Sequence, residues 1–130
     1  MSKVKVFQEN ITYWRKRAQD KKRRLSLRKQ EGCKAAQQCA GILATHYGAR
    51  KVYLIGSLTG SRSVHERSDI DLVVEGLRPE EYFSALSALW RVLPKGMELD
   101  LIPWEDAYPQ TKQRAYREGE VLYERPLPHS

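Results

Sequence analysis

The sequence has little of what a disulfide-bonded, zinc-binding or membrane-spanning protein needs. Among its 130 residues are two cysteines, Cys33 and Cys39, and three histidines. The cysteines lie six positions apart in a helical pattern, so they share no face and do not form a disulfide or a metal pair. No run of 18 apolar residues occurs, and the N-terminus lacks the apolar stretch of a secretory signal. We expect a single cytoplasmic domain with reduced cysteines.

Acidic residues are scarce near the N-terminus. Residues 1–30 contain 11 Lys or Arg and 2 acids, hence +9, whereas residues 31–130 contain 12 against 14, hence −2. The basic residues are densest in residues 15–29, and such density is typical of a segment that binds phosphates in a salt-sensitive way. Two alternatives stay open: a solvated helix, or a helix that packs on a partner through Ile11, Trp14, Ala18 and Leu25.

Proline is absent from residues 8–47, where apolar residues keep helical spacing. We expect one long helix there, divided by Gly32 into an arm and a domain helix and ended by Gly48. Predicted strands then alternate with predicted helices: strands at 51–55, 69–74, 97–102 and 121–123, and helices at 57–64, 79–92 and 109–118.

This order predicts an α/β fold, with a small mixed sheet of three or four strands flanked by helices and a long N-terminal basic helical arm. The predicted boundaries are residues 1–31 for the arm, 32–124 for the folded domain and 125–130 for a flexible tail.

Two acids, Asp69 and Asp71, interrupt an otherwise apolar segment. Side chains alternate along a strand, so both acids point the same way with Cα atoms roughly 6.6 Å apart. They repel by about 2–3 kcal/mol at an effective dielectric near 20 unless a cation lies between them. Asp100, in a later predicted strand, completes a three-carboxylate cluster if the two strands are neighbours.

Carboxylate oxygens suit Mg²⁺ or Mn²⁺, and such a cluster can also deprotonate an attacking hydroxyl. A lone Asp-x-Asp more often marks a strand entrance, with Asp69 in a turn and Asp71 solvated. The three acids together, beside a Gly-Ser turn, favour the metal site.

That turn is Gly56-Ser57, directly after the predicted strand at 51–55. Glycine lets the backbone approach a ligand closely, and backbone N–H groups at a helix start bind anions. Arg62 and Arg67 lie nearby and can add charge-assisted contacts to a triphosphate. The stretch matches neither the P-loop pattern GxxxxGK[ST] nor the dinucleotide pattern GxGxxG.

The combination resembles the DNA polymerase beta-like nucleotidyltransferase superfamily, in particular its minimal branch related to the kanamycin nucleotidyltransferase domain. The resemblance covers roughly residues 37–124 and includes the end, Tyr-Arg-Glu-Gly-Glu-Val-Leu-Tyr-Glu, at 116–124. It rests on the Gly-Ser turn, an 11-residue gap, the Asp-Ile-Asp strand and the later aspartate. The family often reads Gly-Ser-x-Ala-Arg-Gly after the strand, whereas here the arginine, Arg62, is displaced.

The resemblance implies a metal-dependent nucleotidyltransferase. Gly56, Ser57 and Arg62 would bind the nucleotide. Asp69, Asp71 and Asp100 would be both the metal ligands and the catalytic residues. An NMP, which we expect to be AMP from ATP, would pass to an acceptor hydroxyl with Mg²⁺ or Mn²⁺ as cofactor and pyrophosphate released.

The minimal branch also implies a partner, a helical HEPN-type protein, with the pair acting as toxin and antitoxin. The acceptor would then be a tyrosine on that partner, unless the site forms across a homo-oligomer. The alternative function is a catalytically weak binding module that grips a partner protein or RNA through the basic arm.

Overall fold

The structure is a computed structural model that describes residues 3–56 and 69–126, with side-chain environments from residue 10 onward. Its contacts divide the chain into two units, Met1–Glu31 and Gly32–Ser130. The first unit contains the beginning of helix α1 (Lys3–Tyr47), and the second contains the rest of α1 and all the strands. The predicted helix at 57–64 lies outside the described residues.

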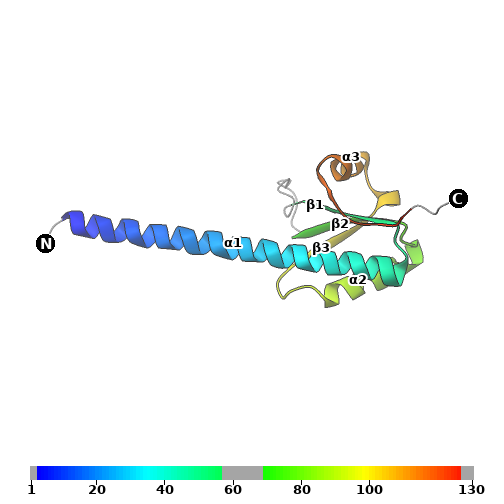
Figure 1. The fold of residues 1–130 in the computed structure, drawn as a ribbon, viewed down its shortest axis with the longest axis horizontal. Coiled ribbons are helices and arrows are strands. Elements are labelled where there is room, and N and C mark those ends of the chain that lie inside the picture. The colour runs from blue at the N-terminus through cyan, green and yellow to red at the C-terminus, as the bar shows by residue number, and fades with distance from the viewer. Residues whose placement is uncertain (1–2, 57–68, 127–130) are drawn as a thin grey trace. The chain divides into compact units, whose positions relative to one another are not determined.

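The second unit is built on a four-stranded sheet in the order β3-β2-β1-β4 (Figure 1). Strand β1 (Lys51–Ile55) pairs antiparallel with both β2 (Ile70–Glu75) and β4 (Glu120–Glu124). Strand β3 (Leu99–Pro103) pairs parallel with β2. The mixed α/β sheet flanked by helices and the long N-terminal helix confirm the predicted fold class.

Each face of the sheet buries a different set of side chains. The larger core packs apolar residues from β1, β2 and β3 against the end of α1 and against α2 (Tyr82–Arg91). The smaller core lies on the other face, where Tyr53, Ile55 and Val73 meet Ala115 of α3 (Pro109–Glu118). Figure 1 shows α2 and α3 on opposite sides of the strands. Both faces are therefore covered, which explains why β2 reads as a nearly continuous apolar run.

Several predicted boundaries shift by a few residues. Helix α1 begins at Lys3 rather than residue 8 and runs through Gly32, although the division into units falls there. The predicted helix at 79–92 is a 3₁₀ turn at Pro79–Glu81 followed by α2. Helix α3 and strand β1 have the predicted bounds.

Local chemistry explains two of the chain reversals. Gly48, at φ +66°, follows the end of α1, and the Ala49 N–H donates to the Leu43 carbonyl at 3.0 Å. Gly76, at φ +90°, directly follows the end of β2, and its N–H donates to Glu105 Oε1 at 3.1 Å. Only glycine adopts such positive φ angles without strain.

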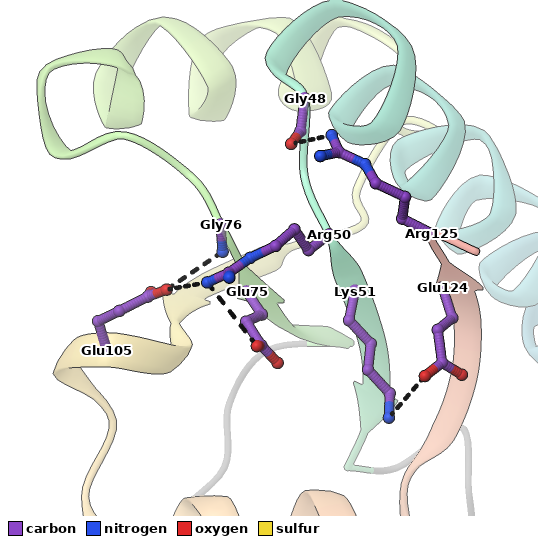
Figure 2. Close-up of polar contacts among 8 residues, drawn as sticks. All are labelled: Gly48, Arg50, Lys51, Glu75, Gly76, Glu105, Glu124 and Arg125. Carbon is purple, nitrogen blue, oxygen red and sulfur yellow. Dashed lines mark hydrogen bonds and ion pairs between the residues drawn. The ribbon is translucent and has the colours of Figure 1, made fainter. Parts of the chain in front are cut away.

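A polar network holds the end of the sheet where β1 starts and β2 ends (Figure 2). Arg50 lies 3.8 Å from Glu75 and 3.9 Å from Glu105, and Lys51 lies 3.5 Å from Glu124. The Arg125 guanidinium donates to the Gly48 carbonyl at 2.8 Å, and the Arg125 backbone N–H donates to Arg50 at 2.8 Å. The hydrogen-bonded part of the domain thus extends one residue into the predicted tail.

No helix within the described residues has the combination of length and apolar character that a membrane crossing requires.

Candidate active site

Two of the predicted site acids lie opposite each other on neighbouring strands. Asp71 is the second residue of β2, Asp100 is the second residue of β3, and the two are register partners. In a parallel pair, register partners point to the same face of the sheet and their Cα atoms are roughly 4.8 Å apart. The face is the one that carries Val73 and Ile102, two residues further along each strand. The strands of these two carboxylates are therefore neighbours, which is the condition that the sequence set for a cluster.

The two carboxylates differ in exposure. Asp71 is 4% exposed and is the one polar or charged residue that is buried in the described part of the chain. Asp100 is exposed. Burying a carboxylate costs several kcal/mol or more unless a hydrogen bond or a cation compensates it. The pair thus places one oxygen donor set inside the protein and one at its surface, which is suited to a ligand that arrives from solvent.

Asp69 lies just before β2 rather than within it. Its carboxylate Oδ2 accepts a hydrogen bond from the Glu98 N–H at 2.9 Å, and its own N–H donates to the Glu98 carbonyl at 3.0 Å. These two bonds join the segments that enter β2 and β3. Asp69 is therefore a strand-entrance residue, as the alternative interpretation of Asp-x-Asp predicts. The same interpretation predicts a solvated Asp71, and there it is wrong, because Asp71 is buried.

The glycine of the Gly-Ser turn lies beside the acids. Ile55, the last residue of β1, is the register partner of Asp71, and Gly56 follows it directly. Gly56 is buried and has φ +95°, a conformation that favours glycine. The backbone thus turns away from the sheet next to Asp71. Ser57 and Arg62, the other predicted nucleotide-binding residues, lie outside the described residues, as does Arg67.

Tyr82, at the start of α2, is a neighbour of the site. The sequence pattern predicted only that Tyr82 lies on the inner face of its helix. Its hydroxyl donates to the Leu101 carbonyl of the edge strand β3 at 2.8 Å. Burial raises the pKa of Tyr82, and the negative charge of Asp100 raises it further. The spacing of apolar residues in α2 did not predict this contact, because helical periodicity shows which face is buried and not which backbone group a hydroxyl contacts.

Aromatic side chains cover the same face of the sheet beyond the acids. The Tyr53 ring stacks on Trp104 with centroids 5.6 Å apart, and Tyr116 meets Trp104 edge-on at 5.2 Å. Lys112 Nζ lies 5.4 Å from the centre of the Trp104 ring. Strand alternation places Tyr53 on the face of Ile55 and so could have identified this residue, but Trp104 and Tyr116 come from segments without that periodicity.

The donor set fits a hard divalent cation in chemistry but is not gathered as a triad. Carboxylate oxygens are the ligands that Mg²⁺ takes in proteins. In residues 3–56 and 69–126, however, no group of three His, Cys, Asp or Glu side chains is close enough together to hold a metal ion. The carboxylates of Asp71 and Asp100, on paired strands, therefore have the right donor chemistry as a pair.

Comparison with known proteins places this geometry among nucleotidyltransferases. Residues 37–126 match the family described as polymerase beta, nucleotidyltransferase. The chain is similar in structure to a mutant of the toxin–antitoxin MntA–HpeT, at 18% identity over 68% of this chain and 73% of that one, with a TM-score of 0.53. It is also similar to a toxin–antitoxin crystallised with AMP-PNP, at 20% identity, with the same coverages and TM-score.

A second mutant of MntA–HpeT gives 21% identity over 65% of this chain and 67% of that one, with a TM-score of 0.50. At these identities the likeness concerns the fold. No curated protein matches the sequence. The family match spans more than half of the chain and contains β1, β2, β3 and the acids that they carry. The chain therefore belongs to the polymerase beta nucleotidyltransferase family.

Proposed function

We propose that the protein is a Mg²⁺- or Mn²⁺-dependent enzyme that transfers AMP from ATP to a hydroxyl group of a partner protein. The observation that carries the proposal is the pairing of Asp71 with Asp100 on one face of the sheet, beside the turn at Gly56. A buried and an exposed carboxylate on adjacent strands would offer oxygen ligands to a divalent ion, which would supply positive charge near the phosphates. The family match supports the reaction class.

The metal would be held by Asp71 and Asp100, with Asp69 as the third ligand. A bound divalent ion neutralises phosphate charge and removes the repulsion between the carboxylates. The residues of the chain then have separable tasks: Asp71 fixes the position of the nucleotide phosphates, Gly56 admits them close to the backbone, and Asp100 faces solvent, where the acceptor arrives. Ser57 and Arg62 are proposed as further phosphate contacts.

In the proposed reaction the acceptor oxygen attacks the α-phosphorus and forms a new P–O bond. The bond between the α-phosphorus and the bridging oxygen breaks, and its electron pair leaves with pyrophosphate. Asp100 takes the hydroxyl proton and passes it to solvent, to which it is exposed. Position and charge neutralisation supply most of the catalysis in phosphoryl transfers of this kind.

The partner is proposed to be a HEPN-type toxin, with this chain as the antitoxin. Support comes from similar structures that are toxin–antitoxin proteins, one of them crystallised with AMP-PNP. In residues 32–56 and 69–126, the second unit consists of the sheet, its helices and two short 3₁₀ turns. An acceptor supplied by a second protein, as a tyrosine hydroxyl, is consistent with so small a unit.

The test has a binding part and a transfer part. Mn²⁺ binding in the presence of ATP is followed by electron paramagnetic resonance, and transfer is followed with ATP labelled at the α-phosphate and the candidate partner. We expect Asp71→Asn and Asp100→Asn each to weaken both signals at least tenfold, while Asp106→Asn, an exposed acid away from the pair, leaves them unchanged. Label transfer by Asp71→Asn at the wild-type rate would exclude the proposed chemistry.

A second candidate function is a catalytically weak binding module. The observation in its favour is the hydrogen bond between Asp69 and the Glu98 N–H, which gives one of the three acids a structural task. In that case Mn²⁺ and ATP bind weakly to the wild type, and Asp71→Asn and Asp100→Asn change neither binding nor association with the partner.

A further inference from the structure

Residues 12–31, which make up most of the described part of the first unit, have an accessible surface. Every residue from 12 to 31 is exposed, including apolar side chains that proteins usually bury. Tyr13 and Trp14 are 58% and 61% exposed, and Leu25 and Leu27 are 59% and 51% exposed. A helix with such a surface gains most of its stability from a binding partner rather than from its own residues.

The charge of this segment selects the kind of partner. Residues 10–31 contain nine Lys or Arg and two acids, a net charge of +7. At 1.5 Å per residue, these 22 residues span roughly 33 Å of helix. So many cations over that length repel a second copy of the segment and attract a polyanion.

The cations surround the helix instead of forming one stripe. At 100° per residue, Lys16 and Arg23 lie on the side opposite Trp14, while Lys21 and Arg28 lie within about 40° of it. Leu25 and Leu27 lie roughly 200° apart for the same reason. Ile11, Trp14, Ala18 and Leu25 do lie on one side of the helix, but Lys21 falls between Ala18 and Leu25 on that side and interrupts the seam. The segment thus has no continuous apolar face of the kind that a membrane surface or a coiled coil requires.

Aromatic and cationic groups meet near the N-terminal end of this segment. The Tyr13 and Trp14 rings pack edge to face with centroids 5.6 Å apart, and the Arg17 guanidinium lies 5.7 Å from the centre of the Trp14 ring. A shallow groove of about 630 Å³ is lined by Tyr13, Lys16, Arg17, Asp20, Arg23 and Arg24. Exposed rings offer stacking surfaces for unpaired bases, and the neighbouring cations contact phosphates.

We propose that residues 12–31 bind single-stranded nucleic acid, with a base stacked on Trp14 or Tyr13 and the phosphates on the surrounding Lys and Arg side chains. RNA and single-stranded DNA share this chemistry. The activity is independent of the proposed nucleotidyl transfer, since it uses none of the strand carboxylates.

The experiment uses the full-length chain and two variants that lose the same charge. Lys22→Gln/Arg23→Gln/Arg24→Gln removes three cations from the segment, and Arg91→Gln/Lys95→Gln/Arg117→Gln removes three exposed cations from the second unit. Glutamine is a good helix former, so circular dichroism should be the same for the wild type and the arm variant. Fluorescence anisotropy measures binding to labelled oligonucleotides, RNA and DNA separately, between 50 and 300 mM salt.

We expect the arm variant to bind at least tenfold more weakly and its salt slope to fall by about 2, since each single-strand phosphate contact contributes roughly 0.7. The second-unit variant should bind like the wild type. Trp14→Ala should weaken single-strand binding roughly tenfold and leave duplex binding unchanged, because stacking needs an unpaired base. If the affinities for RNA and single-stranded DNA differ, the more tightly bound of the two is the natural ligand.

Three results would overturn the proposal. The first is equal loss of binding in both triple variants, which would mean that net charge alone acts. The second is binding of polyglutamate or of anionic lipid vesicles as tightly as the oligonucleotide. The third is absence of oligonucleotide binding by the wild type at 50 mM salt. None of these depends on transfer activity, so a failed transfer assay leaves this test intact.

Discussion

Asp71 and Asp100 are register partners on parallel strands, one buried and the other exposed. Like charges that lie directly opposite each other in a sheet destabilise it. With metal removed by EDTA, Asp100→Asn should therefore raise the free energy of unfolding by up to about 1 kcal/mol. Urea denaturation measures this change.

Under the proposed function, adding Mg²⁺ or Mn²⁺ should make the wild type more stable than Asp100→Asn, the opposite of the result in EDTA. The metal should stabilise the wild type by mass action and have much less effect on Asp100→Asn. Asp106→Asn is the control, because it removes one exposed acid elsewhere in the domain. If Asp100→Asn lowers stability in EDTA, the Asp100 carboxylate makes a stabilising contact and the repulsion argument fails.

Tyr82 provides a reporter for the charge of Asp100. Its pKa is raised first by burial and second by that carboxylate. Asp100→Asn should lower the pKa of Tyr82 without restoring its ordinary value, because burial remains. The absorbance of tyrosinate between pH 8 and 12, with a Tyr82→Phe titration subtracted, isolates this residue from the other six tyrosines. An unchanged Tyr82 titration in Asp100→Asn would mean that solvent screens the two groups from each other.

Sequence periodicity predicted most of the sheet because its strands are short, apolar and separated by turn residues. The bounds of β1 follow directly from Lys-Val-Tyr-Leu-Ile before a glycine. The parallel pairing of β2 with β3, which brings Asp71 opposite Asp100, follows only from the fold as a whole. The sequence therefore supplied this pairing only as a condition for the carboxylate cluster, since no local pattern encodes strand order.

The site was predicted less fully because hydrogen bonds to the backbone leave no sequence pattern. Alternation alone treats Asp69 and Asp71 as equivalent, whereas the structure gives them different surroundings. The Asp69 carboxylate accepts the Glu98 N–H, and Asp71 is buried beside the end of β1. Aspartate side chains often accept hydrogen bonds from nearby backbone N–H groups, and these bonds compete with regular strand structure.

Gly76 is expected to be intolerant of any side chain. It has φ +90°, and a Cβ there would lie 3.0 Å from the Arg50 backbone nitrogen. Gly96 is a matched control, with φ +81° and open space around its Cβ position. Gly76→Ala should lower the free energy of unfolding by about 1–2 kcal/mol more than Gly96→Ala does. Both variants force alanine into a positive φ angle, but only Gly76→Ala also brings a Cβ against the Arg50 backbone. Equal losses in thermal or urea unfolding would show that the backbone near Arg50 relaxes.

Cys39 should make stability fall at alkaline pH. The residue is fully buried in the larger core, and burial raises its pKa from 9.0 to about 12. Because the folded pKa lies above the unfolded one, the stabilisation is complete below pH 9 and is lost as the pH rises toward 12. At pH 10.5 the loss specific to this thiol is about 2 kcal/mol.

The measurement compares urea unfolding at pH 7.5 and 10.5 for the wild type, Cys39→Ala and Cys33→Ala. Cys39→Ala lowers stability at both pH values because it leaves a small cavity, but it should lose about 2 kcal/mol less than the wild type between them. Cys33→Ala, at a half-buried position of the same helix, should keep the full alkaline loss. Identical pH dependence in the wild type and Cys39→Ala would mean that the thiolate is accommodated in the folded core, and the assigned cause of the pKa shift would be wrong.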